Sequence, residues 1–274
     1  MTLANIFLLL ATGIFAGFAG GLLGLGGSFI MTPVQYVLYT DMGLPADTAI
    51  KLAFGTSLLV VLPTALSGTL RHARQGAVIK KTAIIMGSSS LLAACGGATL
   101  AAHIPGTALR IAFGVLILGS GIRMLFTRQA SASGELKENS WLLAAWAIPV
   151  GIISGLLGIG GGILLVPLLV LVFKYNIHNA MATSLAIMVF MSAGGALGYI
   201  INGLGVPQLP AYSIGYVYLP AFLVLTAASA GMAQIGAITT HRLPARHLRY
   251  IFIAVMFYLG IKMLGVFDLL GWPL

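Results

Sequence analysis

Apolar stretches recur along the whole of this chain, and short polar segments separate them. Six of them are uninterrupted and lie at residues 50–70, 82–102, 108–127, 180–201, 212–238 and 248–267. A helix needs about 20 apolar residues to cross the hydrocarbon core of a bilayer. The pattern therefore predicts six transmembrane helices.

Two further apolar runs, residues 3–40 and 141–175, are interrupted by glycine. The interruptions read Ala19-Gly-Gly-Leu-Leu-Gly-Leu-Gly-Gly-Ser28 and Ile153-Ser-Gly-Leu-Leu-Gly-Ile-Gly-Gly-Gly162, and each is followed by a proline, Pro33 or Pro167. Each glycine in a helix costs about 1 kcal/mol relative to alanine. We therefore expect a broken helix in each run.

The two halves of the chain repeat the same order of motifs. An offset of 134 residues aligns Pro33 with Pro167, and an offset of 127 aligns Thr56-Ser57 with Thr183-Ser184. At an offset of 139, Pro105-x-x-x-Leu109-Arg110 matches Pro244-x-x-x-Leu248-Arg249. The same offset aligns Gly121-Ile-Arg-Met-Leu125 with Gly260-Ile-Lys-Met-Leu264. Four matches in one order indicate duplication. We assign residues 1–127 to a first repeat, 128–140 to a polar linker and 141–274 to a second repeat.

Basic residues indicate how the repeats are oriented. The loop at 71–81 is strongly basic and its counterpart at 202–210 is not, whereas the next pair of loops reverses this pattern, with the basic copy at 241–249. Cytoplasmic loops carry excess Lys and Arg, so equivalent loops of swapped charge predict inverted repeats. If each broken run is a re-entrant hairpin, it enters and leaves the membrane on the same face. Both basic loops and the linker are then cytoplasmic, and both termini lie outside. Charge alone requires this only of the second run, and symmetry extends it to the first.

Composition supports an all-α polytopic protein of the cell membrane. With 59% hydrophobic and 7% charged residues, the chain could not cover the surface of a soluble domain. The net charge of +9 is explained by cytoplasmic loops, so we expect the lipid bilayer and no nucleic acid as its surroundings. All carboxylates lie in loops or at span ends, which argues against cation transport, and we expect no enzyme activity, metal or cofactor. The sequence leaves a homo-oligomer open.

The glycine breaks are the candidate binding site. Irregular backbone persists in a membrane only where it lines a cavity or is buried in protein. The helices that restart near Ser28 and Ile163 would point positive N-terminal ends and unpaired amides at that place, which suits an anion. The candidate residues are Gly24, Gly26, Gly27, Ser28, Gly158, Gly160, Gly161 and Gly162. Close helix packing through small residues is the alternative explanation.

Two further sets of side chains are candidates. Thr56, Ser57, Thr183 and Ser184 could donate hydroxyl hydrogen bonds to a ligand, or could bond their own helix backbone. Lys51 and His178 occupy equivalent positions before a span. They are either anchors at the membrane interface or residues of a vestibule that attracts anions.

These motifs together resemble the sulfite exporter TauE/SafE family of membrane permeases. The resemblance rests on the doubled glycine motif, the following prolines, the Thr-Ser pairs and the Pro-x-x-x-Leu-Arg sequences, and it covers Leu3 to about Leu264. It implies transport of small sulfur-containing anions such as sulfite, sulfoacetate or other organosulfonates. Combined with the helix-end site, the expectation is export by alternating access. An anion channel, an importer of another small anion and a non-transport membrane subunit are the alternatives.

Overall fold

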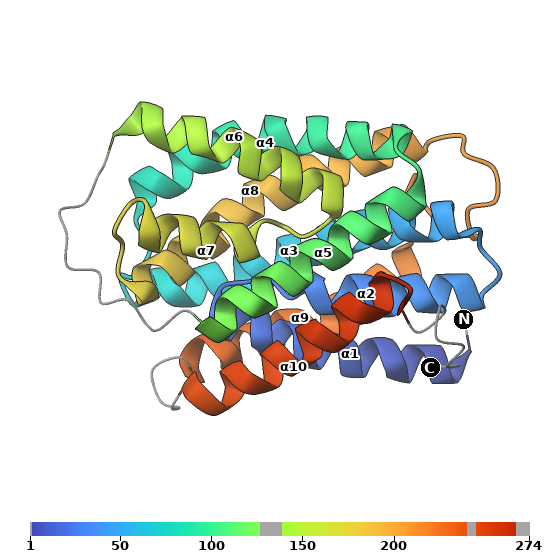
Figure 1. Cartoon of the computed structure of the whole chain (residues 1–274), viewed down its shortest axis with the longest axis horizontal. Helices are drawn as coiled ribbons and strands as arrows, with labels where there is room; N and C mark the ends of the chain where they lie inside the picture. Colours follow the sequence, from blue (N-terminus) through green and yellow to red (C-terminus); the bar gives the residue numbers. More distant parts are fainter. Residues whose placement is uncertain (1, 127–138, 240–244, 267–274) are drawn as a thin grey trace.

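The computed structural model describes residues 2–126, 139–239 and 245–266 (Figure 1). In this part of the chain the regular elements are ten helices: α1 (Leu3–Leu23), α2 (Ser28–Asp41), α3 (Ala46–Arg74), α4 (Lys80–His103), α5 (Gly106–Phe126), α6 (Ser140–Leu157), α7 (Gly162–Leu171), α8 (Ile177–Gly203), α9 (Leu219–Thr239) and α10 (Ala245–Met263).

Seven of the described helices are long and apolar enough to cross a membrane: α1, α3, α4, α5, α6, α8 and α9. Large apolar side chains face outward, among them Trp141, which is 86% exposed. In lipid this outer surface needs no polar cover. The chain is thus an all-helical, multi-pass membrane protein. The helices that precede the glycine breaks, α1 and α6, are themselves long enough to cross the membrane. The expected division into six spanning helices and two re-entrant hairpins did not anticipate this.

The expected helix at 212–238 begins later, at Leu219. The preceding segment turns back onto α8, where the Tyr216 amide donates to the Tyr199 carbonyl at 3.1 Å. A Cβ atom on Gly203 would lie 2.2 Å from the Tyr216 nitrogen, so only glycine allows this approach. Burial, and secondly the charge of Asp47, raise the pKa of the Tyr216 phenol.

The helices run back and forth along the long axis of the molecule (Figure 1). α1 begins at the right of the view and runs left, and α2 returns to the right. α5 ends and α6 begins at the left, and α10 runs from left to right. The ends of α3 and α4 that carry the basic loop at 71–81 lie at the left as well.

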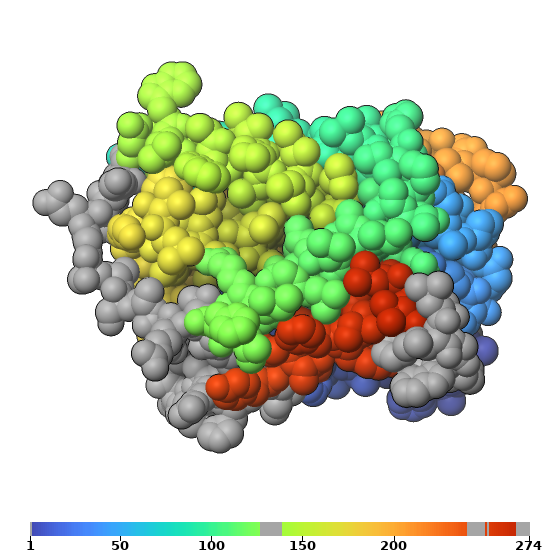
Figure 2. Space-filling model, viewed as in Figure 1, coloured from blue at the N-terminus to red at the C-terminus, as the bar shows by residue number. Residues whose placement is uncertain are grey.

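Packing interleaves the two halves. α1 lies against α9, and α6 lies against α4. Glycine permits both contacts, because a Cβ atom on Gly21 would lie 2.0 Å from the Ala233 carbonyl oxygen, and one on Gly155 would lie 2.0 Å from that of Ala94. α5 and α10 pack side by side and form part of the face shown in Figure 2. The first helix of each half thus packs against a helix of the other half.

Candidate functional site

Both glycine-rich runs are broken as expected, and the glycines adopt a backbone conformation that other residues avoid. Gly24, Gly26 and Gly27 have φ values of 70°, 77° and 79°, and their counterparts Gly158, Gly160 and Gly161 have 64°, 72° and 87°. This left-handed region is open to glycine at no steric cost. It turns the chain sharply between α1 and α2 and again between α6 and α7.

The two breaks lie on either side of the same two side chains, Val61 of α3 and Met188 of α8. A Cβ atom on Gly26 would lie 2.0 Å from Met188 Cε and 3.4 Å from Val61 Cγ1. One on Gly160 would lie 3.0 Å from Val61 Cγ1 and 3.2 Å from Met188 Cε. Val61 and Met188 are themselves equivalent at the 127-residue offset. The breaks therefore meet at one place.

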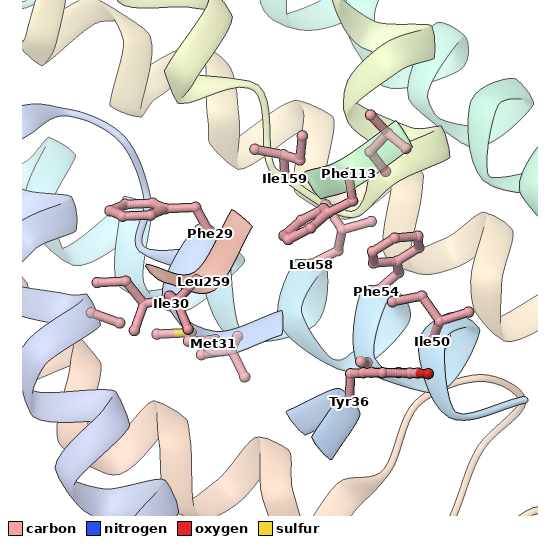
Figure 3. Packing of buried hydrophobic residues seen from close by; sticks show 14 of the residues in the cluster. Phe29, Ile30, Met31, Tyr36, Ile50, Phe54, Leu58, Phe113, Ile159 and Leu259 are labelled. Carbon is pink, nitrogen blue, oxygen red and sulfur yellow. The ribbon is translucent and has the colours of Figure 1, made fainter. Parts of the chain in front are cut away.

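Hydrogen bonds tie the first break to the second half of the chain. The Ser28 hydroxyl donates to the Ile159 carbonyl in the second break. The Ser184 hydroxyl of α8 donates to the Gly24 carbonyl at 2.9 Å. Phe29 and Ile159 belong to a single buried core cluster around these bonds (Figure 3).

The first amides of α2 and α7 point into this region. Neither N-terminal cap residue, Gly27 or Gly161, has a side chain to bond them. Among the described residues, no hydrogen bond takes up the amides of residues 26–29 or of residues 160–163. All of these residues are buried. Two helix N-termini with unpaired amides thus lie together inside the protein, an arrangement that favours an anion.

The four hydroxyls of the two Thr-Ser pairs have different hydrogen-bond partners. Ser184 contacts the first break, whereas Thr56 accepts the Tyr218 amide at 3.0 Å and Thr183 accepts the Ile79 amide at 3.1 Å. Ser57 accepts hydrogen bonds from Thr32 and Gln35. The structure therefore does not bring the four hydroxyls together as one ligand set.

Ser57 belongs to a buried polar network that the sequence analysis missed. Gln35 Nε2 donates to Ser57 Oγ at 2.8 Å, and the Tyr39 hydroxyl donates to Gln35 Oε1 at 2.8 Å. Thr32, Gln35 and Tyr39 lie three or four positions apart on one face of α2. The corresponding positions after the second break are all apolar: Val166 and Leu169 of α7, and Phe173 just beyond its end. This departure from the repeat was a visible signal of the network.

The proposed vestibule residues, Lys51 and His178, each lie one helical turn before a residue that packs against a break: Phe54 beside Gly158 and Met181 beside Gly24. The Lys51 ammonium is buried, 2.9 Å from Asp47 Oδ2 and 3.0 Å from the Ala102 carbonyl, and the other Asp47 oxygen accepts the Gly106 amide. These bonds join the start of α3 to the α4–α5 connection. His178 is exposed in the first turn of α8. Within the described residues, no cluster of His, Cys, Asp and Glu could hold a metal ion.

Ser154, which precedes the second break on α6, was also missed. It is fully buried, and its hydroxyl has no hydrogen-bond partner in the described structure. Because Gly20 occupies the equivalent position of the first half, the repeat gave no reason to single it out.

The chain resembles known proteins over most of its length. It is 28% identical to a probable membrane transporter protein of Methanocaldococcus jannaschii over 94% of both chains. It is 27% identical to one of Haemophilus influenzae, over 94% of this chain and 97% of the other. With the probable membrane transporter protein YunE of Bacillus subtilis it shares 30% identity, over 73% and 80% of the two chains. No solved structure matches it. The family model described as sulfite exporter TauE/SafE matches residues 9–263, so the chain belongs to this family of membrane transporters.

Proposed function

We propose that this transporter moves small sulfur-containing oxyanions, such as sulfite or organosulfonates, by binding them between the two glycine breaks. The observation that carries the proposal is the meeting of two helix N-termini, with unpaired buried amides, around Val61 and Met188. A sulfite or sulfonate group presents several acceptor oxygens and a negative charge. Both features match amide donors at the positive ends of α2 and α7.

Alternating access is supported by the relation between the halves. Positions equivalent in the repeat make equivalent contacts across it: Gly68 faces Leu185 of α8, and its counterpart Gly195 faces Leu58 of α3. α1 and α6 run in opposite directions (Figure 1). Both features are expected of inverted repeats, in which one half can rock against the other around a shared central site. In this proposal α1–α2 and α6–α7 are the re-entrant hairpins.

The basic loops support an orientation in the cytoplasmic membrane with these loops inside and the termini outside. The positions of the carboxylates support export. In the described part of the chain the carboxylates are at helix ends, Asp41 at the end of α2 and Asp47 in the first turn of α3. No carboxylate of this part therefore lies beside the breaks to hold a coupling cation. An anion leaving a cell gains about 2.3 kcal/mol per charge for each 100 mV of inside-negative potential, which is enough to drive export.

Flux into proteoliposomes of known orientation tests the proposal. Labelled sulfite, an alkylsulfonate and sulfate are compared in the purified protein without any partner. Alternating access predicts saturable uptake and counterflow, with sulfite or the sulfonate preferred. Flux that rises linearly with concentration would indicate a channel, and no anion flux at all would refute transport of these anions.

A further inference from the structure

Ser154 is a buried hydroxyl without a hydrogen-bond partner. It lies on α6 one turn before the second break and is fully buried. Its carbonyl accepts the amides of Gly158 and Ile159, but its Oγ atom makes no bond in the described structure. Buried hydroxyls are almost always hydrogen-bonded, because an unmet donor inside a protein is unfavourable. This exception needs an explanation.

The hydroxyl is directed at the second break. A Cβ atom on Gly161 would lie 3.5 Å from Ser154 Oγ. The amides of residues 160–163, at the start of α7, also have no acceptor among the described residues. An O–H donor of α6 therefore lies beside the start of α7, where several N–H donors also have no acceptor among the described residues.

The first break has no equivalent donor. Its counterpart of Ser154 is Gly20, where a Cβ atom would lie 2.9 Å from the Gly26 carbonyl carbon, so a side chain does not fit. Its own serine, Ser28, is already bonded to the Ile159 carbonyl. The two breaks are consequently unequal, and only the second has a side-chain hydroxyl available.

We infer that the Ser154 hydroxyl, together with the amides of residues 160–163, binds an oxygen of the transported oxyanion. This inference rests on the proposed function and adds a specific binding residue to it. Oxygens of an anion at this point can accept from these orphan donors, whereas a cation would face only donors. Ser154 thereby makes the second break the stronger half of the site.

The substitution Ser154→Ala separates binding from stability. Because the hydroxyl makes no hydrogen bond in the described structure, its loss leaves the melting temperature of anion-free protein unchanged or raised. A charge-assisted hydrogen bond is lost with the ligand, so KM for sulfite or the preferred sulfonate rises roughly 10- to 100-fold. The anion concentration that stabilises the protein against heat rises in parallel. Proteoliposome counterflow and thermal unfolding in detergent measure the two effects.

Ser90→Ala is the matched control. Ser90 is equally buried on α4, but its hydroxyl donates to the Gly87 carbonyl of its own helix at 2.9 Å. We expect KM to stay within twofold of that of the unaltered protein. Ser154→Cys, which retains a weak donor, gives an intermediate KM.

Two results would overturn the inference while leaving the proposed function intact: an unchanged KM in Ser154→Ala, or a clear fall in melting temperature without anion, which would make the hydroxyl structural. If the unaltered protein shows neither saturable flux of these anions nor stabilisation by them, the proposed function fails and the inference fails with it.

Discussion

Two groups of glycines in this chain are needed for different reasons. Those at the breaks have positive φ and would be strained with any side chain. Others, such as Gly21 and Gly155, are ordinary helical residues that let a neighbouring helix approach. The upstream spacing Gly13-x-x-x-Gly17 also belongs to the second group, since both residues lie against α9. Only the first group lies at the candidate site.

Gly158→Ala tests the first group. A left-handed conformation costs an alanine roughly 1–2 kcal/mol, and its Cβ atom would also lie 2.6 Å from Phe54 Cβ. We expect a lower melting temperature and loss of most anion flux. Gly119→Ala on α5 is the control, because nothing lies within 4 Å of its Cβ position. It should be neutral or gain up to about 1 kcal/mol. Equal effects of both variants would show that the break geometry is unimportant.

Lys51 provides a test between an anchoring and a vestibule role. Its ammonium is buried, while the Asp47 side chain is 53% exposed, so we expect Lys51→Met to cost only about 1–2 kcal/mol of stability. Asp47→Asn should cost more, because it leaves the buried ammonium unpaired. The double variant should recover part of that loss. A vestibule role would instead raise KM for the anion in Lys51→Met at unchanged stability, so thermal unfolding and flux together decide between the two roles.

At the scale of elements, the α1–α2 pair determines the topology. If it forms a re-entrant hairpin, the start of α1 and the start of α3 lie on the same side of the membrane. Both α1 and α3 are long enough to span by themselves, so helix length does not settle the matter.

Single cysteines in a Cys95→Ser background measure this topology. Ala4, Ala46 and Ala73 are exposed at the start of α1 and at the two ends of α3. We expect a membrane-impermeant thiol reagent to label Ala4→Cys and Ala46→Cys from outside, and Ala73→Cys only after the cells are opened. Labelling of positions 4 and 46 from opposite sides would show that α1–α2 crosses the membrane once.

At the scale of the whole molecule, the interleaved packing makes the site a product of both halves. α3 and α8 lie against each other in the centre, and each contributes one of the two side chains between the breaks. A relative movement of the halves would thus alter both breaks together, as alternating access requires.

Transport without a coupling ion predicts a dependence on membrane potential. For a monoanionic alkylsulfonate, 100 mV corresponds to about 2.3 kcal/mol, or roughly a 50-fold ratio of concentrations at equilibrium. We expect this ratio in proteoliposomes with an imposed potassium potential, and no change when sodium or a pH gradient is added. Accumulation that follows either gradient would demonstrate coupling instead.

Much of the architecture could be predicted from the sequence, because it depends on local composition and on self-similarity. Apolar run length predicts the helices, and consecutive glycines predict the breaks between α1 and α2 and between α6 and α7. The duplication remains a prediction, which rests on motif matches at offsets of 134, 127 and 139 residues. Membership of the family also follows from motifs along the chain.

The tertiary structure alone decided which groups meet. Ser28 is bonded to a carbonyl 131 positions away, Thr56 holds an amide 162 positions away, and Lys51 is paired within its own helix. Residues 212–218 turn back onto α8 because Gly203 admits them. Ser154 has no hydrogen-bond partner in the described structure, although other buried helical serines do. Local pattern determines which backbone is helical or broken, but the partner of a buried polar group depends on segments that are distant in sequence and brought together by packing.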